Sequence, residues 1–412
     1  MSSKLPFKRA LAAIGGSAGM ALSSLVLALC LMQKGAVEEY GLFAFLLITQ
    51  ALANGVSNAI LGAPLLIALN ESTSVNNERV RSFMLANLAL CMVFACVQAS
   101  FAWLYSESGV IALVYTFSGF ATTLRWFGRS YCNNCHQHQR VVYSDAIYSV
   151  LCLSGAAVLY LSDWVDLYSF GLLTAVSAIF ALFMLGAEYF QKQFTALFSA
   201  SLDGFLKGYR AQGKHALIGV VSTEATVNAH SYLVTFLLGP KAFAPLAAAT
   251  LLFRPANVVF SSLMQIERPR LRKLIAGHQT VEARKSLKRF YTISISFWLA
   301  NSVAAALLLS LYPALYWSDS SSLSVLFVAA GLMSLIVLVR ALRNPVSVFL
   351  QAQDRFKTLA NITLFACAVT IPLVYILLVN LGVAPSLFGV LVGDLIALTL
   401  IALNLKKELQ GA

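Results

Sequence analysis

Charged residues are scarce in this chain of 412 residues. Asp, Glu, Lys and Arg together make up 11% of it, whereas an ordinary soluble domain carries roughly 25%. Acidic residues are the rarer kind, at 17 against 29 basic ones. Long hydrophilic segments are also lacking, so no separate soluble domain fits between the apolar stretches. The scarcity of charge excludes an ordinary soluble protein.

Cysteine pairs suited to disulfides are lacking too. The seven cysteines are an odd number, and they lie within apolar stretches or at positions that we assign below to the inner side of a membrane: Cys30, Cys91, Cys96, Cys132, Cys135, Cys152 and Cys367. This distribution gives no disulfide framework, and we interpret these residues as small apolar packing groups. No stretch resembles a nucleotide-binding loop, so we expect neither ATP hydrolysis nor a bound cofactor.

Apolar sequence, in contrast, is abundant, with 59% hydrophobic residues and a mean hydropathy of +0.78. Apolar stretches of about 20 residues recur along the whole chain, each long enough to cross a hydrocarbon layer roughly 30 Å thick as a helix. We count twelve, at residues 10 to 32, 40 to 69, 82 to 104, 109 to 128, 143 to 162, 167 to 187, 216 to 238, 242 to 265, 290 to 312, 323 to 343, 358 to 380 and 384 to 404. The pattern predicts an all-α polytopic membrane protein with about twelve transmembrane helices.

The formal net charge of +12 has a distribution that indicates membrane topology and not nucleic-acid binding. With the N-terminus inside, only Lys34 and Lys241 of the 29 basic residues fall on the outer side. The positive-inside rule therefore predicts that both termini are cytoplasmic. The basic, small-residue N-terminus resembles a signal peptide, but its apolar stretch is too long, and we interpret it as an uncleaved first helix.

The stretch SYCNNCHQHQR contains Cys132, Cys135 and His136 in the C-x-x-C-H spacing of a c-type haem site, followed by His138. On the predicted topology these residues are cytoplasmic, whereas haem c is attached on the outer side of a bacterial membrane. A zinc site is disfavoured because all four side chains come from one short stretch, while structural zinc sites draw ligand pairs from separated segments. We interpret the stretch as a polar loop without a metal.

The two halves of the chain show matching features at the same rank among their apolar stretches. The matched pairs are Arg125 with Arg340, Arg129 with Arg343, Arg140 with Arg355, and Asn54 with Asn257. Two halves of the same orientation are typical of several transporter folds. We therefore predict two six-helix lobes around a central cavity, at residues 1 to 187 and 216 to 412. The connecting segment, residues 188 to 215, is either an amphipathic segment on the inner leaflet or a solvated linker.

Ionisable groups inside apolar stretches are costly and tend to face a cavity or a partner. Glu224 and His230 lie in GVVSTEATVNAHSY, a polar stretch that indicates a water-filled pathway or a buried hydrogen-bonded seam. Arg254 precedes Pro255, where a kink would direct the guanidinium inward, or else it reaches toward the inner surface. Asp394 lies beside Gly393, and it is either a partner of another helix or a coupling group.

A set of arginines in a cavity suits a diphosphate group, because guanidinium keeps its charge and pairs with phosphate oxygens through two parallel donors. A carboxylate such as Glu224 could bind a proton or a sodium ion and link ion flow to substrate movement. The predicted substrate-binding residues are Arg254, Arg125, Arg340, Arg129, Arg343, Asn257 and Asn54. The predicted ion-coupling residues are Glu224, His230 and Asp394. The combination predicts export of an anionic, lipid-attached substrate.

Three stretches resemble a known family, namely EEYGLFAFLLITQALANGVSNAILGAPL, LGPKAFAPLAAATLLFRPANVVFSSLMQIERPRL and RNPVSVFLQAQDRFK. They are similar to the polysaccharide-exporter branch of the multidrug/oligosaccharidyl-lipid/polysaccharide superfamily. The resemblance implies a Wzx-type flippase of the bacterial inner membrane, with two lobes forming a V-shaped cavity. Its substrate would be undecaprenyl-diphosphate-linked sugar repeats for O-antigen, capsule or exopolysaccharide. It further implies Arg254, Arg125 and Arg340 as cavity-facing residues, and membrane lipid, a polysaccharide polymerase and glycosyltransferases as partners.

Three other interpretations stay open. A cation-coupled multidrug antiporter of the same superfamily would favour a carboxylate-rich cavity, whereas the charges here are mostly arginine. A membrane enzyme such as a polymerase or ligase needs a substantial outer loop for catalytic groups, which this chain lacks, so we expect no enzymatic activity. A structural or assembly subunit without transport activity is the third.

Overall fold

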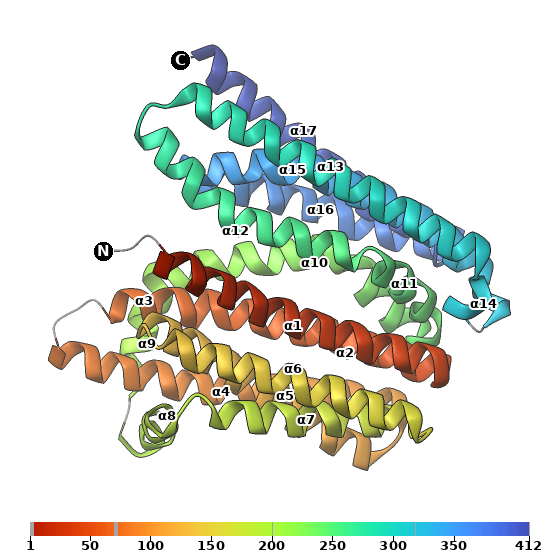
Figure 1. Ribbon diagram of the computed structural model, residues 1–412, viewed down its shortest axis with the longest axis horizontal. Helices are drawn as coiled ribbons and strands as arrows, with labels where there is room; N and C mark the ends of the chain where they lie inside the picture. Colours follow the sequence, from red (N-terminus) through yellow and green to blue (C-terminus); the bar gives the residue numbers. More distant parts are fainter. Residues whose placement is uncertain (1–3, 70–72, 200, 318, 412) are drawn as a thin grey trace. The chain divides into compact units, whose positions relative to one another are not determined.

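The computed structural model describes residues 4–69, 73–199, 201–317 and 319–411, and it is all helical, with no strand in that part of the chain (Figure 1). Its contacts divide it into two compact units, Met1–Val221 and Ser222–Ala412, here called unit 1 and unit 2. The predicted all-α fold is confirmed. The lobe and linker boundaries inferred from the sequence stay a prediction.

Each predicted apolar stretch coincides with a single helix or with two or three consecutive ones. Unit 1 contains α1 (Lys4–Lys34), α2 (Val37–Ser57), η1 (Asn58–Gly62), α3 (Ala63–Ala68), α4 (Thr73–Ser106), α5 (Gly109–Asn134), α6 (His138–Leu161), α7 (Leu167–Phe183), α8 (Ala187–Ser199), α9 (Asp203–Gly208), η2 (Tyr209–Gly213) and the start of α10 (Lys214–Leu238). Unit 2 contains the rest of α10, α11 (Pro240–Leu252), α12 (Arg254–Ala276), α13 (Thr280–Leu311), α14 (Pro313–Tyr316), η3 (Ser320–Ser322), α15 (Leu323–Ala352), α16 (Phe356–Leu381) and α17 (Leu387–Gly411).

Eight helices in the described part are long and apolar enough to cross a membrane. The number rises to ten if the bent pairs α7 with α8 and α11 with α12 each form one span. The bends measure 102° and 54°. Helix α10 is not among these ten, and α1 contributes only the shorter apolar piece Ala18–Lys34. The chain is thus a multi-pass membrane protein, and the count of twelve stays a prediction.

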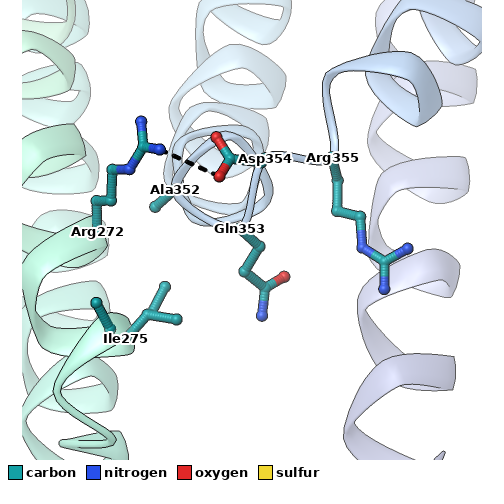
Figure 2. Close-up of a pocket in the computed structure, with 7 residues that line it drawn as sticks. Arg272, Ile275, Ala352, Gln353, Asp354 and Arg355 are labelled. Carbon is teal, nitrogen blue, oxygen red and sulfur yellow. Dashed lines mark hydrogen bonds and ion pairs between the residues drawn. The ribbon is translucent and has the colours of Figure 1, made fainter.

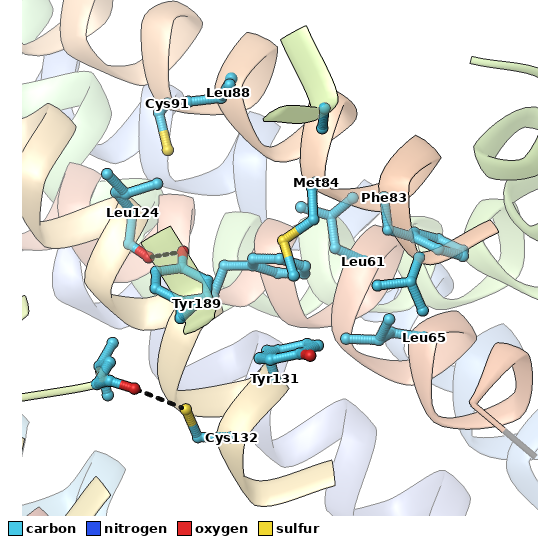
Figure 3. Packing of buried hydrophobic residues seen from close by; sticks show 14 of the residues in the cluster. Leu61, Leu65, Phe83, Met84, Leu88, Cys91, Leu124, Tyr131, Cys132 and Tyr189 are labelled. Carbon is cyan, nitrogen blue, oxygen red and sulfur yellow. Dashed lines mark hydrogen bonds between the residues drawn. The ribbon is translucent and has the colours of Figure 1, made fainter. Parts of the chain in front are cut away.

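The core of unit 1 lies where α4, α5 and α8 meet, and it explains the C-x-x-C-H stretch (Figure 3). The Cys132 side chain is fully buried, and its thiol donates to the carbonyl oxygen of Leu185 at 3.8 Å. Nearby, the hydroxyl of Tyr189 on α8 donates to the carbonyl of Leu124 at 2.9 Å. Cys132 is therefore a packing residue of the core.

Helix α8 turns sharply away from α7 and is amphipathic. Its buried face presents Tyr189 and Gln193 to α4 and α5, and the Gln193 amide donates to the carbonyl of Met84 at 2.6 Å. Its opposite face exposes Phe194 and Phe198. One face of the connecting segment is therefore attached to unit 1. The placement of the other face on the inner leaflet stays a prediction.

In unit 2, α15 packs against α11, α12, α13 and α17, while α16 packs closely on α17. Glycines permit the close approach of α16 and α17. A Cβ atom at Gly389 would lie 2.6 Å from the Val374 side chain, and one at Gly393 would lie 1.8 Å from the Thr370 hydroxyl. These glycines place Asp394 in the interior of the unit, where its exposed fraction is 0%.

The helix ends after α5 and α15 have the same type of turn, which also ends α12 at His278. His136 and Asp354 have φ values of 60° and 61°. In both turns the amide of that residue donates to the carbonyl three residues earlier, and the next amide donates to the carbonyl five residues earlier. The matching of the two halves inferred from the sequence stays a prediction.

Candidate functional site

Two buried clusters, each with two arginines on one carboxylate, lie within the helices. In unit 1, Arg125 and Arg129 are one turn apart on α5 and both reach Asp145 on α6. Arg125 Nη2 lies 2.6 Å from Asp145 Oδ1, and Arg129 Nη2 lies 2.7 Å from Asp145 Oδ2. Arg125 Nε also donates to the Ser144 hydroxyl at 3.0 Å. The cluster carries a net charge of +1.

Neighbouring side chains enclose the unit 1 cluster. The Arg125 guanidinium lies over the Tyr148 ring at 4.5 Å, and that of Arg129 lies over the Trp126 ring at 4.7 Å. Helix α1 approaches so closely that a Cβ atom at Gly16 would lie 2.8 Å from Asp145 Oδ2. Arg125 is only 2% exposed. In this structure it has almost no surface to offer a substrate, and it holds α5 to α6.

The second cluster, in unit 2, joins α15 to α17. Arg340 Nε donates to Asp394 Oδ2 at 2.8 Å, and Arg343 Nη1 donates to Asp394 Oδ1. Both carboxylate oxygens thus accept from guanidinium groups. The side chains of Arg340 and Arg343 are 12% and 18% exposed. This cluster also has a net charge of +1, and its arginines are more accessible than Arg125.

The four arginines and Asp394 were predicted from the sequence, but Asp145 was missed. The two carboxylates come from different places in the halves, since Asp145 lies on α6, the helix after α5, whereas Asp394 lies on the last helix. No repeat argument could therefore have found one from the other. The available signal was charge balance, because an arginine pair inside apolar helices requires a nearby counter-charge.

Two polar side chains of α10, Glu224 and His230, lie within electrostatic range of Arg340. Glu224 Oε2 accepts from the Asn228 amide at 2.7 Å, and the His230 ring nitrogen Nε2 lies 3.1 Å from the Ser231 hydroxyl. His230 is buried, whereas Glu224 is partly exposed. Among the predicted residues in unit 2, Arg340 and Asp394 are hydrogen-bonded, and Glu224 and His230 lie within electrostatic range of Arg340.

Arg254 is the first residue of α12, directly after the 54° bend. Pro255 lies in the first turn of α12, where its missing N–H breaks no helical hydrogen bond. Asn301 on α13 connects the two sides of the bend. Its Nδ2 donates to the carbonyl of Leu252 at 2.8 Å, and its Oδ1 accepts from the amide of Ala256 at 3.1 Å. Sequence reasoning missed Asn301, which has no local signature.

The two predicted asparagines lie in different units. Asn257 is half-buried in the first turn of α12, three residues after Arg254. Asn54 lies on α2 in unit 1, where its Oδ1 accepts from Gln50 at 3.2 Å. Gln50 also donates to the Thr123 hydroxyl at 3.1 Å. Asn54 therefore belongs to a small polar network between α2 and α5.

Among the residues that the structure describes, no group of three or more His, Cys, Asp or Glu side chains could hold a metal ion. Nδ1 of His138 lies 3.1 Å from Oδ1 of Asn133.

No protein-family model matches the chain. No curated protein matches it either. Several solved structures do have its fold. An inward-facing multidrug resistance MATE family transporter of the MOP superfamily matches with a TM-score of 0.72 and 12% identity, over 95% of each chain. The lipid II flippase MurJ in an inward closed conformation matches with a TM-score of 0.72 and 12% identity, over 97% of this chain and 87% of MurJ.

An outward-facing MATE family transporter of the same superfamily also matches, with a TM-score of 0.64 and 15% identity, over 98% of this chain and 94% of that one. Identities this low show a shared fold, and they do not by themselves show a shared substrate. The predicted two-lobed transporter fold is confirmed, while the polysaccharide-exporter branch stays a prediction.

Proposed function

We propose that this chain is a flippase that moves undecaprenyl-diphosphate-linked oligosaccharide repeat units across the bacterial inner membrane for surface polysaccharide synthesis. Both termini would be cytoplasmic, and a polysaccharide polymerase and glycosyltransferases would act beside it. The observation that carries the proposal is the pair of partly accessible arginines, Arg340 and Arg343, on the single carboxylate of Asp394 in unit 2. The fold, shared with a lipid II flippase and with MATE transporters, supports it.

An excess positive charge within membrane helices favours an anionic substrate. Each arginine costs about 2.5 to 3.5 kcal/mol at a helix centre on insertion scales, so a second guanidinium per carboxylate requires a reason. In unit 2, Arg340 and Arg343 use Nε and Nη1 on Asp394, and their other N–H groups stay available. Asp394 thereby positions two guanidinium forks that suit the oxygens of a diphosphate.

Glu224 is the proposed ion-coupling group. It is partly exposed and within electrostatic range of Arg340. A phosphate at Arg340 and a proton or sodium ion at Glu224 would favour each other, because each offsets the charge that the other brings. His230 lies within range of the same arginine. Asp394 has both oxygens engaged by guanidinium groups, so in this proposal it takes part in coupling only by releasing or holding the arginines.

The test compares lipid extracts of cells that lack the protein with extracts of cells carrying it or its variants, by mass spectrometry. Loss of the protein should lead to accumulation of complete diphosphate-linked repeat units and loss of surface glycan. Arg340→Gln should do the same at normal protein level, because it removes the excess charge and leaves the neutral pair Arg343 with Asp394. Arg284→Gln is the matched control, because it removes an exposed charge on α13.

A cation-coupled multidrug antiporter is the second candidate, favoured by the MATE likeness and by the partly exposed carboxylate of Glu224. An unchanged lipid pool and surface glycan in the deletion strain, with the glycan pathway expressed, would contradict the flippase proposal. Reduced efflux of a cationic dye in that strain would then support the antiporter. A strain that changes in neither assay would favour a non-transporting assembly subunit.

A further inference from the structure

The bend between α11 and α12 contains a side-chain bridge in place of a helical hydrogen bond. In a continuous helix the amide of Ala256 would donate to the carbonyl of Leu252, four residues earlier. Here both groups bond to Asn301 of α13, whose Nδ2 donates to the Leu252 carbonyl at 2.8 Å and whose Oδ1 accepts from the Ala256 amide at 3.1 Å. The next helical bond is intact, because the Asn257 amide donates to the Phe253 carbonyl at 3.2 Å. The Asn301 side chain is thus inserted into one helical hydrogen bond.

Two causes of helix kinks meet at this bend of 54°. Pro255 has no N–H to donate to the carbonyl of Leu251, and a proline within a helix produces a kink. An inserted side chain is another cause of kinks, and Asn301 supplies it. A proline is permanent, whereas a side-chain amide can be withdrawn by a change of rotamer. Asn301 is therefore the reversible part of the bend.

Helix α13 is held against α15 on both sides of Asn301. The Trp298 Nε1 donates to the carbonyl of Ser334 at 2.9 Å, and the hydroxyls of Ser302 and Ser334 lie 2.8 Å apart. Trp298 lies three residues before Asn301, and Ser302 directly follows it. The Asn301 amide therefore reaches the bend from a helix that α15 keeps in place.

The far end of α12 is also attached to α15. Figure 2 shows Arg272 reaching from α12 to Asp354 in the turn after α15, with Arg272 Nη2 at 3.2 Å from Asp354 Oδ2. In the core beside this turn, Leu271 packs with Val348 and Ala352 of α15. The second half of α12 is thus fixed to α15, and a change in the bend angle changes the direction of α11 relative to α12.

We propose that residues 252 to 256 form a reversible hinge whose bent state is stabilised by Asn301. Backbone polar groups within a membrane need protein partners, because hydrocarbon supplies none. In the bent state Asn301 is the partner of both the Leu252 carbonyl and the Ala256 amide. When Asn301 is withdrawn, these two groups can bond to each other, and the span becomes straighter. The backbone is therefore satisfied in both states.

The hinge lies beside two predicted substrate-binding residues, Arg254 and Asn257, so a change in its angle moves them relative to α11. A transporter fold requires such changes of shape, and hinges are formed by a few residues at the ends of helices. The proposal goes beyond the proposed function, because it concerns the conformation of one span and does not depend on which substrate the chain carries.

The test is a distance measurement by double electron–electron resonance on the full-length protein in lipid nanodiscs. Spin-labelled noncanonical residues replace Lys241 on α11 and Arg268 on α12, both of which are exposed. With a rise of about 1.5 Å per residue, the backbone separation of the two sites is about 36 Å at the bend of 54° and about 39 Å at a proline kink of about 25°. The measurement therefore distinguishes the two states.

Asn301→Leu removes both the donor and the acceptor at nearly constant volume. It should lengthen the mean distance by about 3 Å, because only the proline kink remains. Asn380→Leu is the matched control on α16, where the Asn380 side chain donates to the Ile376 carbonyl of its own helix at 2.7 Å. This control should leave the distance at its wild-type value.

Pro255→Ala separates the effect of Asn301 from that of the proline, and it tests the proposal even if Asn301→Leu fails to insert. With Asn301 in place, Pro255→Ala should keep the wild-type distance. Combined with Asn301→Leu, it should lengthen the distance by about 4 Å, because the span can then be a straight helix. A wild-type distance in Asn301→Leu, or the full lengthening in Pro255→Ala alone, would overturn the proposal.

Discussion

Replacing Asp394 by Asn should be strongly destabilising, because Asp394 balances two arginines inside unit 2. Its exposed fraction is 0%, and its two oxygens accept from Arg340 and Arg343, which are themselves largely buried. Asn has one oxygen and no charge, so both guanidiniums would be left without a counter-charge. Removing one member of a buried ion pair typically costs about 3–5 kcal/mol. We expect Asp394→Asn to fall in that range.

The arginine variants separate this charge effect from a loss of packing. Arg343→Gln leaves the neutral pair Arg340 with Asp394, so it should cost only about 1–3 kcal/mol for the lost charged hydrogen bond. The combination Asp394→Asn with Arg343→Gln leaves one uncompensated guanidinium in place of two. Its cost should therefore fall short of the sum of the single costs by more than about 1 kcal/mol.

The assay is unfolding of each purified variant by dodecyl sulfate in mixed micelles, followed by circular dichroism. Glu282→Gln is the control, because Glu282 pairs with Lys285 at the surface, where the side chains are 54% and 69% exposed. Such a pair is worth roughly 0–1 kcal/mol. A cost for Asp394→Asn as mild as that of this control, or single costs that add to within about 0.5 kcal/mol, would contradict the predicted charge effect.

Two further predictions concern packing and a surface turn. Gly393→Ala should destabilise the protein by about 1–3 kcal/mol in the same assay, because its Cβ would lie 1.8 Å from the Thr370 hydroxyl, and Thr370→Ala in that background should restore part of the loss. Hydrogen bonds from the Ser321 and Ser322 hydroxyls hold the pKa of Asp319 below its ordinary value of 3.8. A lowered carboxyl pKa means that the stability Asp319 contributes is complete above pH 3.8 and is lost as the pH falls through the lowered value. The difference in melting temperature between wild type and Asp319→Asn should therefore be constant at higher pH and vanish in acid; a difference that persists there would contradict this.

Hydropathy was enough to locate the helices, because a segment that crosses a hydrocarbon layer must satisfy its own backbone hydrogen bonds. All twelve apolar stretches coincide with helices. The bends between consecutive helices were less predictable from the sequence than the helices themselves. The bend between α11 and α12 occurs one residue before Arg254, and Asn301 of α13 binds both of its sides. A contact from a distant helix leaves no signal in the sequence around the bend.

The residues of the candidate site were likewise only partly predictable from the sequence. Residue type and hydropathy are local properties, so the sequence was enough to place arginines, Glu224, His230 and Asp394 in apolar helices. Their partners became apparent only from the packing of the helices. This packing added Asp145 as the partner of Arg125, and it paired Arg340 and Arg343 with Asp394.

The physical reason is that the cost of a charge in a membrane depends on what lies within a few ångströms of it, not on its own identity. Residue type predicts that a guanidinium will seek a counter-charge. Which carboxylate supplies it depends on how helices from separate parts of the chain pack, as Gly16 brings α1 against Asp145 and Gly393 brings α16 against α17. The sequence therefore determined which chemistry the membrane helices carry, and the packing of the helices decided which of these charges are paired and which remain accessible.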